Sequence, residues 1–432
     1  MLGNIVIVGG GAGGLELASK LGRKLGPARV ALVDSRLTHI WKPSLHEVAA
    51  GTLDIHQEGL SYQMLAHDNG FSFVYGALTG LDAASRHITV APVHTPQGEE
   101  LLPERRLPFG HLVIAVGSTS NYFGVPGAKE HSISLNATED AERFRLGMLK
   151  LLLHAEMRKA EDPGAGVDIV IIGGGATGVE LAAELREASS IYASYGFHRL
   201  DPRRDLRITV LEGAERILAP LEERVSVAAA DLLAKRAITV RTSCRVTSIE
   251  ADRVIDKEGN VYPADLVVWA AGIRAPEFLG MLGLPVNKNG QIDVDATLAV
   301  KAMPGMYALG DCAACPDGDG KLVPPRAQAA HQQADYLADQ LLDLAAGKKP
   351  SVAPYKYRDY GSLVSVGHST SVGNLMGSLK GSSFFVEGTF ARLMYMSLHL
   401  MHHAAVMGAL RTGLLAIARF LIKRSKPLVK LH

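Results

Sequence analysis

Near its amino terminus the chain reads VIVGGGAGGLELASKL (Val6–Leu21), and the pattern returns as VIIGGGATGVELAAEL (Val170–Leu185). The two segments are identical at 11 of 16 positions and lie 164 residues apart. That period is far longer than the roughly 20–50 residues of a solenoid repeat. Each copy begins with a β-branched run and continues after its glycines with apolar residues at helical spacing. The repeat therefore predicts two nucleotide-binding units of α/β type, one inserted into the other or following it.

The first copy carries the pattern G-x-G-x-x-G directly after a strand and at the start of a helix. Its glycines are Gly9, Gly11 and Gly14. Such glycines allow a tight turn, bring a pyrophosphate close to the backbone and let the helix pack on the strand. Asp34 closes the next predicted strand, 20 residues after Gly14, where a carboxylate binds a ribose hydroxyl in such folds. A glycine turn in another α/β fold is the alternative, which this combination disfavours.

The second copy repeats the glycine pattern, and a different acid closes the strand that follows. Its glycines are Gly173, Gly175 and Gly178, and Glu212 ends the next predicted strand. Glu212 lies 34 residues after Gly178, a longer spacing than usual, because a polar and aromatic stretch intervenes. A carboxylate at that strand end would repel a 2′-phosphate, so the sequence favours NADH over NADPH. A solvated strand end is the alternative interpretation of Glu212.

A third element follows both glycine units. The chain reads GMYALGDCA at Gly305–Ala313, a short apolar strand that ends in Gly310 and Asp311. A Gly-Asp pair alone is common in turns. Its position resembles that in flavoproteins with two dinucleotide domains, where the Asp meets the ribityl or phosphate part of FAD. We therefore predict FAD in the first unit and a return of residues 296–351 to it.

Further runs predict additional strands. Two apolar runs that end in small residues, His111–Ser118 and Asp265–Ile273, form a second matched pair of candidates. The stretches 71–93 and 237–262 alternate in polarity, which predicts antiparallel β elements.

Length, composition and charge bound the class of protein. A chain of 432 residues exceeds one ordinary core, and 47% hydrophobic residues with 45 glycines suit an α/β protein rich in tight turns. The net charge of +1 argues against a nucleic-acid partner. Residues 391–432 nevertheless hold seven Lys or Arg and no acid, which leaves a net charge of −6 on the preceding residues. A basic tail on an acidic body predicts a separate role for the tail.

The cysteines predict no redox or metal chemistry. Three of them, Cys244, Cys312 and Cys315, are too few for a disulfide scaffold and favour a reduced cytosolic setting. The C-x-x-C pair would suit a redox pair or half of a zinc site. No second cysteine pair or matching histidine cluster accompanies it, and its place differs from that of the active pair in disulfide reductases. We interpret it as an incidental pair near the flavin phosphates, and we predict no metal site.

Together the motifs resemble those of type II NADH:quinone oxidoreductases, the single-subunit, non-proton-pumping respiratory NADH dehydrogenases of bacteria. The resemblance covers nearly the whole chain. It rests on both glycine motifs and on HIWKPSLHEVAAGTLD (His39–Asp54), GMYALGDCAACP (Gly305–Pro316) and PPRAQAAHQQA (Pro324–Ala334). It implies two Rossmann-like dinucleotide-binding domains, a C-terminal membrane-associated helical region, non-covalently bound FAD, and NADH as the electron donor.

The resemblance also implies roles for particular side chains. Gln328 and Gln332, in the A-Q-x-A-x-Q segment of the family, lie four residues apart on one helix face and are expected to contact quinone or the flavin edge. By sequence alone, a polar helix face is the commoner interpretation. Glu180 matches a family glutamate near the nicotinamide and the flavin, although its place also suits a first-turn helix residue. Lys380 resembles the family lysine near the flavin. The remaining candidate ligands are Lys42 and Gly117 for FAD and Gly272 for NADH.

The domain boundaries follow from the same comparison of motifs. We expect residues 1–118 and 296–351 to form the FAD-binding domain and residues 119–295 the NADH-binding domain. Residues 352–432 are expected to form a C-terminal region with amphipathic membrane-anchoring helices at about 390–425.

The C-terminal segment decides how the protein would meet a membrane. Leu393–Leu410 lacks Asp, Glu, Lys and Arg over 18 residues, at the lower limit for a spanning helix. Three histidines inside it make spanning costly, and Gly408 and Gly413 suggest a break. Basic residues among the apolar ones that follow predict helices lying in the membrane interface. A pair of core or dimer-contact helices is the alternative.

The predicted function is that of a respiratory enzyme that passes a hydride from NADH to N5 of FAD and then two electrons to membrane quinone. A homodimer attached peripherally to the cytoplasmic face of the plasma membrane is expected from the resemblance. Two rival functions stay open. One is a sulfide:quinone oxidoreductase-like enzyme, whose cysteines flank the flavin, and the other is a non-respiratory NADH-binding flavoprotein such as apoptosis-inducing factor.

Overall fold

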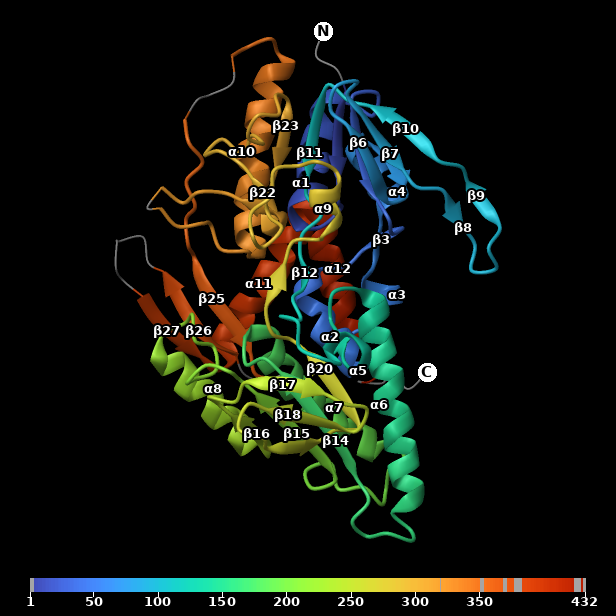
Figure 1. Cartoon of the computed structure of the whole chain (residues 1–432), viewed down its shortest axis with the longest axis vertical. Helices are drawn as coiled ribbons and strands as arrows, with labels where there is room; N and C mark the ends of the chain where they lie inside the picture. Colours follow the sequence, from blue (N-terminus) through green and yellow to red (C-terminus); the bar gives the residue numbers. More distant parts are fainter. Residues whose placement is uncertain are drawn as a thin grey trace.

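The computed structural model describes residues 4–318, 320–349, 353–367, 371–376, 383–422 and 429. Figure 1 shows two α/β layers arranged along the long axis of the molecule, the blue and orange one above the green and yellow one. The red C-terminal helices lie between them. Each layer is built around a five-stranded parallel sheet, as the internal repeat predicts.

The first sheet holds the first glycine motif at its centre. Its strand order is β23-β11-β1-β2-β5, and all four pairings are parallel. Central strand β1 is buried at every residue, and its side chains share one core with those of α1, α10 and the antiparallel strands at residues 78–90. Helix α1 follows the glycine turn and packs against α10. The bounds are β1 Ile5–Val8, α1 Ala12–Leu25, β2 Val30–Asp34, β5 Ser72–Tyr75, β11 His111–Ile114, β23 Met306–Ala308 and α10 Ala327–Ala345.

An antiparallel sheet of order β10-β7-β6 extends from this layer. Its strands are β6 Leu78–Asp82, β7 His87–Val90 and β10 Arg105–Pro108. The prediction of antiparallel structure over residues 71–93 is therefore right for β6 and β7 and wrong for β5. Strand β5 is the parallel edge strand of the first sheet, and all four of its residues are half-buried. An edge position of this kind produces the mixed polarity that an antiparallel strand also shows.

The second sheet repeats the plan around the second glycine motif. Its order is β13-β20-β14-β15-β16, again parallel throughout. The prediction for residues 237–262 needs the same correction, because β16 is a parallel edge strand and only β17, β18 and β19 are antiparallel. The bounds are β13 Ile133–Ser134, α6 Thr138–Arg158, β14 Val167–Ile172, α7 Ala176–Ser194, β15 Leu206–Leu211, α8 Glu223–Lys235, β16 Ile238–Arg241, β17 Val246–Ile249, β18 Arg253–Asp256, β19 Val261–Pro263 and β20 Leu266–Trp269.

The C-terminal region forms a three-stranded antiparallel sheet followed by two helices. Strands β25 Gly361–Ser365, β26 Ser371–Met376 and β27 Ser383–Glu387 lead into α11 Gly388–Met407 and α12 Ala409–Ile422. The predicted break occurs at Gly408, whose φ of +85° favours glycine, whereas Gly413 lies within α12. None of the helices in the described part of the chain combines the length and apolar character needed to cross a bilayer.

Shorter elements occur between these longer ones along the chain. They are β3 Thr38–His39, η1 Lys42–Ser44, α2 Leu45–Ala50, α3 Ile55–Glu58, β4 Leu60–Ser61, α4 Tyr62–Asn69, β8 Val93–His94, β9 Glu100–Leu102, β12 Thr119–Ser120, α5 Ala128–His131, β21 Ile273–Arg274, α9 Phe278–Met281, β22 Ile292–Asp293, η2 Gly310–Cys312 and β24 Ala313–Ala314.

Candidate active site

A single large cavity joins the two glycine units. Its volume is about 2330 Å³, and its walls include α1, α2, α7, α10 and the C-terminal helices. Most residues singled out from the sequence line it, although they come from segments far apart in the chain. The predicted residues on its wall are Gly9, Gly11, Asp34, Lys42, Gly117, Gly175, Glu180, Gly272, Gly310, Asp311, Gln328 and Gln332. Gly14, Gly173, Gly178 and Glu212 lie behind the wall, and Lys380 falls outside the described residues.

The glycines of the first turn are required by the backbone and by the cavity. Gly9 has φ +103°, and a Cβ there would lie 2.4 Å from the carbonyl oxygen of Ala115. A Cβ on Gly14 would lie 1.9 Å from the carbonyl oxygen of Gly9, so the helix can pack on the turn only without it. A Cβ on Gly11 would meet no protein atom within 4 Å and would project into open space at the start of α1. The turn therefore leaves a cradle for a phosphate at a helix amino terminus.

The acid at the end of β2 braces this turn. The Asp34 carboxylate accepts hydrogen bonds from the backbone N–H of Gly10 at 2.6 Å and of Arg36 at 2.8 Å. Burial raises the pKa of Asp34, and the hydrogen bonds from Gly10 and Arg36 oppose that rise. Because Asp34 also lines the cavity, it both fixes the glycine turn and faces the space for a ribose.

The second unit reproduces this bracing with Glu212. Its carboxylate accepts from the backbone N–H of Gly174 at 2.6 Å and of Ala214 at 2.7 Å. A Cβ on Gly175 would again meet no protein atom, whereas a Cβ on Gly178 would lie 2.0 Å from the carbonyl oxygen of Gly173. Both units therefore have the geometry of a dinucleotide-binding turn.

Three segments bring the other candidate FAD residues together. Lys42 donates to the carbonyl oxygen of Ser118 at 2.9 Å, and the Ser118 hydroxyl donates to the Asp311 carboxylate at 2.7 Å. Burial lowers the pKa of Lys42, and the nearby Asp311 charge opposes that decrease. Gly117 and Gly310 have φ of +71° and +72°, which explains why glycine precedes the polar residue in both segments.

Both glutamines of α10 hold the chain segment 358–361. Gln328 donates to Asp359 and to the carbonyl oxygen of Gly361, and it accepts from the N–H of Tyr360 at 3.2 Å. Gln332 donates to the carbonyl oxygen of Arg358 at 2.8 Å and accepts from its N–H at 3.0 Å. The side-chain amide of Gln328 has two N–H donors, so both are engaged, while its oxygen retains accepting capacity.

Glu180 lies on the opposite wall, in the first half of α7. It is buried, and its carboxylate accepts from the N–H of Ser365 at 3.0 Å. Its other oxygen lies 3.6 Å from Nδ1 of His46, a buried residue of α2. The sequence analysis did not single out His46, although the residue belongs to the HIWKPSLHEVAAGTLD segment. A local motif of that kind cannot show which glutamate the histidine meets.

The cysteines stay outside the chemistry that the cavity can support. All three are free and buried. Burial raises the pKa of the Cys312 and Cys315 thiols to about 12, so neither forms a thiolate nucleophile near neutral pH.

The second C-terminal helix presents one face to the cavity and another to the outside. Leu415 and Ala418 line the cavity. Four large apolar side chains, Leu410, Leu414, Ile417 and Leu421, are at least 61% exposed and recur at helical spacing on one face. Helix α12 therefore offers an exposed apolar face next to the cavity.

Comparisons with known proteins agree with this geometry. Residues 3–334 match the family model described as pyridine nucleotide-disulphide oxidoreductase. The type II NADH:quinone oxidoreductase of Haemophilus influenzae is 40% identical over 99% of this chain and 100% of its own length. A demethylphylloquinone reductase of Synechocystis is 31% identical over 85% of each chain. The structure of an NDH2 from Plasmodium falciparum in complex with NADH has the same fold, with a TM-score of 0.82 at 18% identity over 100% of both chains.

Proposed function

Because this chain belongs to the type II NADH:quinone oxidoreductases, within the pyridine nucleotide-disulphide oxidoreductases, we propose that it is a respiratory NADH dehydrogenase that reduces membrane quinone without pumping protons. The observation that carries the proposal is the common cavity. Walls from both glycine units, α10 and the C-terminal helices surround it, so a donor and an acceptor can meet one cofactor there.

FAD fits the first unit and NADH the second. When bound, FAD accepts a hydride from NADH and returns two electrons to quinone. The open spaces at Gly11 and Gly175 would receive the two pyrophosphates, and Asp34 would hold the FAD ribose. Lys42, Gly117, Gly310 and Asp311 would contact the remainder of FAD, and Gly272 would contact NADH. The boundaries 1–118 with 296–351 and 119–295 remain our assignment, and the pairing of β23 with β11 supports the return of residues 296–351 to the first unit.

The chain's own residues would orient the two substrates and manage protons. Glu180 would stand where nicotinamide and flavin meet, held by Ser365 and close to His46. Gln328 would accept one hydrogen bond from a quinol hydroxyl while its N–H groups hold Asp359 and Gly361. Gln332 would hold the same segment. The role of Lys380 near the flavin stays a prediction from the resemblance.

Membrane attachment through the C-terminal helices is the second part of the proposal. The exposed apolar face of α12 and the seven basic residues of 391–432 support a peripheral, monotopic contact with an anionic lipid surface. Quinone would enter beside α12. We further propose a homodimer and attachment at the cytoplasmic face, both from the family resemblance.

Neither rival function gains support from the site. A sulfide:quinone oxidoreductase from Aquifex aeolicus shares the fold, with a TM-score of 0.70 at 18% identity. The buried thiols of this chain, with their raised pKa values, do not suit sulfide chemistry.

The test is NADH consumption by the purified protein with and without a short-chain quinone. We expect fast oxidation that requires quinone. Slow oxidation by oxygen that is indifferent to quinone would support a non-respiratory flavoprotein instead. Membrane binding is tested separately, by removing residues 391–432 and measuring sedimentation with anionic vesicles, where we expect the truncated chain to stay in the supernatant.

A further inference from the structure

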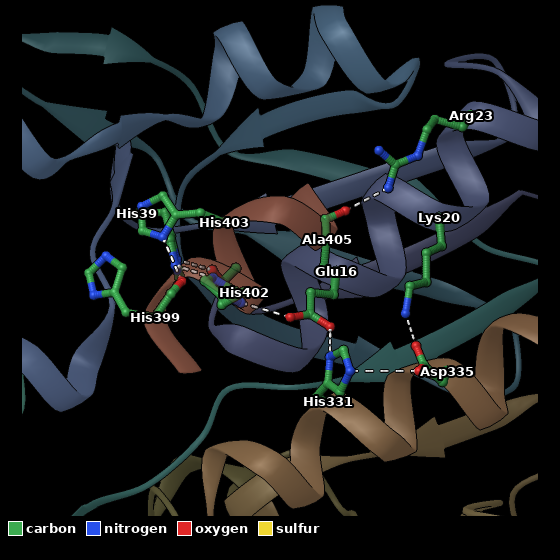
Figure 2. Close-up of polar contacts among 11 residues, drawn as sticks. Glu16, Lys20, Arg23, His39, His331, Asp335, His399, His402, His403 and Ala405 are labelled. Carbon is green, nitrogen blue, oxygen red and sulfur yellow. Dashed lines mark hydrogen bonds and ion pairs between the residues drawn. The ribbon is translucent and has the colours of Figure 1, made fainter. Parts of the chain in front are cut away.

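A buried polar cluster behind the first glycine turn is not used by the proposed reaction. Its centre is Glu16 of α1, whose exposed fraction is 1%. One Glu16 oxygen lies 2.7 Å from Nδ1 of His402 on α11, and the other contacts Nδ1 of His331 on α10. Figure 2 shows both histidines directed at the carboxylate, each joined by a dashed line to a different oxygen. Three helices that are far apart in sequence therefore meet at one carboxylate.

The contacts continue from His402 to the first glycine turn, which would hold the FAD phosphates. Nε2 of His402 lies 2.9 Å from Nε2 of His39, and Nδ1 of His39 lies 2.9 Å from the carbonyl oxygen of Gly10. His39 and His402 are both buried, and with Gly10 and Glu16 they line the cavity. Two consecutive contacts thus connect His402 of α11 to Gly10 in the turn, and a third connects His402 to Glu16 of α1.

The number of hydrogen atoms that these contacts require determines the total charge of Glu16, His402 and His39. Its two ends, the Glu16 carboxylate and the Gly10 carbonyl, are acceptors, and each of the three contacts needs one hydrogen. Two neutral imidazoles supply only two hydrogens, so the nitrogen lone pairs of His39 and His402 would face each other at 2.9 Å. The geometry is satisfied only when the unit of Glu16, His402 and His39 holds one additional proton.

The surroundings place that proton on His402. Burial raises the pKa of Glu16, but hydrogen bonds from His331 and His402 outweigh it and bring the pKa to about 2, so the carboxyl is ionised. Burial lowers the pKa of His39 well below its usual value, and the neighbouring His402 lowers it further. The ring of Trp41 lies with its centroid 4.4 Å from that of His402, a position that favours a cation.

We propose that His402 is a buried imidazolium held between Glu16 and His39, and that this charge makes helix α11 part of the FAD phosphate-binding site. Helix α11 then acts as a clamp on the cofactor, while the exposed apolar face proposed to contact the membrane is on the next helix, α12. His402 and Glu16 are positioning residues, since they act through His39 and the Gly10 carbonyl. The inference rests on the proposed function only in that FAD occupies the first glycine turn.

Without the additional proton, one of the three contacts has no hydrogen, so α11 and the first glycine turn would separate more easily. The other titratable or charged groups around the cluster are Lys20 and Arg23 of α1, Asp34 of β2, Tyr62 of α4, His331 and Asp335 of α10, and His399 and His403 of α11. A metal ion is the weaker interpretation of Glu16, His331 and Asp335, because the Lys20 ammonium already pairs with Asp335.

The protonation state is tested directly in the wild-type protein. In the holoprotein labelled with ¹⁵N-histidine, long-range ¹H–¹⁵N spectra at pH 7 should show both ring nitrogens of His402 carrying hydrogen. The His402 signal is assigned as the one that is missing from the spectrum of the His402→Gln variant. A signal with one protonated and one bare ring nitrogen would overturn the proposal, whatever the variant does.

The clamp is tested by FAD release, a readout that needs no turnover. At pH 7 His402→Gln, which cannot be a cation, should release FAD after dilution roughly tenfold faster than the wild type, as expected for one lost hydrogen bond to a charged group. Flavin fluorescence follows the release. His399→Gln, on the same helix, is the matched control and should follow the wild type.

The outcomes separate the clamp from the proposed function. If the wild type takes up FAD and His402→Gln releases it at the wild-type rate, the clamp is refuted and the enzyme assignment stands. If the wild type takes up no FAD, the proposed function and the clamp fail together. If His402→Gln and His399→Gln accelerate FAD release equally, the effect comes from a general loosening of α11, and the clamp is refuted.

Discussion

The two glycine-rich units follow one plan in their turns and diverge one helical turn later. In both, the acid at the end of the second strand accepts from a turn N–H at 2.6 Å, Asp34 from Gly10 and Glu212 from Gly174. The repeat then places a buried glutamate at the same position of each helix, Glu16 and Glu180. Glu16 meets His331 and His402, whereas Glu180 meets Ser365 and lies close to His46.

The difference between Glu16 and Glu180 shows which features of a glycine-rich unit are determined by contacts within the unit itself. The turn and its acid satisfy backbone groups within the unit, so both copies keep them. The helix glutamate is satisfied only by groups from elsewhere in the chain, because a buried carboxylate needs donors. One copy therefore supports an ion pair with the C-terminal helix, and the other faces the place where the substrates would meet.

Replacing the third glycine of each turn is expected to have the largest effect. In Gly14→Ala the new Cβ would lie 1.9 Å from the carbonyl oxygen of Gly9, and in Gly178→Ala 2.0 Å from that of Gly173. We expect Gly14→Ala to lose FAD altogether and Gly178→Ala to keep FAD but lose NADH-dependent reduction. Bound flavin after purification and flavin bleaching by NADH measure the two effects.

Gly11→Ala and Gly175→Ala are the matched controls. Their Cβ atoms would meet no protein atom within 4 Å, so thermal unfolding of the ligand-free chain should be close to wild type. Dinucleotide affinity should fall, since the methyl group would enter the phosphate cradle. Normal FAD content in Gly14→Ala would contradict the assignment of the first unit.

The second largest effect should separate the two helix glutamates. Glu16→Gln removes one partner of a buried ion pair and should cost about 3 kcal/mol of unfolding free energy at neutral pH. Since the folded-state pKa of Glu16 lies at about 2, below the usual glutamate value of 4.5, its ionised form stabilises the protein above pH 4.5. The difference between wild type and variant should shrink as the pH falls from 4.5 toward 2.

Glu180→Gln is the counterpart in the other unit. We expect it to slow hydride transfer from NADH and to leave FAD content near the wild-type value. Denaturant unfolding at several pH values measures the stability of both variants, and stopped-flow reduction measures their rates of hydride transfer. If both variants lost the same stability and the same activity, the two glutamates would not have the separate roles that their partners indicate.

Gln328→Ala should affect the quinone side of the cavity. The variant loses the hydrogen bonds to residues 359–361 and an acceptor at the wall. We expect reoxidation of the reduced flavin by quinone to slow roughly tenfold, as for loss of one or two hydrogen bonds, while flavin reduction by NADH changes little. Equal losses in both half-reactions would remove Gln328 from the quinone site.

The smallest effect is expected for Glu212→Gln. An amide still accepts one backbone hydrogen bond, so the turn should persist, but the negative charge that would repel a 2′-phosphate is gone. The ratio of kcat/KM for NADH over NADPH should fall several-fold. An unchanged ratio would show that Glu212 braces the turn and does not select the nucleotide, in keeping with its place behind the cavity wall.

Local patterns predicted the parts of the structure that depend on local backbone geometry. The two glycine turns, the acids that follow them and the break at Gly408 all reflect constraints within a few residues or within one βαβ unit. The same patterns misassigned β5 and β16, since an edge strand of a parallel sheet is half-buried and alternates like an antiparallel strand.

The cluster around Glu16 could not be predicted in this way. His402 lies 386 residues from Glu16 and 363 residues from His39, so no local motif connects them. One signal was available, because the repeat aligns Glu16 with Glu180, the residue chosen as a catalytic candidate. His46 was likewise hidden inside a quoted motif, since only the fold brings α2 beside α7.

The central claim is that both glycine units serve one cavity, so that NADH and quinone react through a single bound flavin. Anaerobic stopped-flow absorbance of the purified holoprotein tests it most directly. The account predicts that NADH bleaches the flavin, that added quinone restores the oxidised spectrum, and that the two phases together account for the steady-state rate. Bleaching by NADH that quinone cannot reverse, or a flavin that NADH does not bleach, would contradict it.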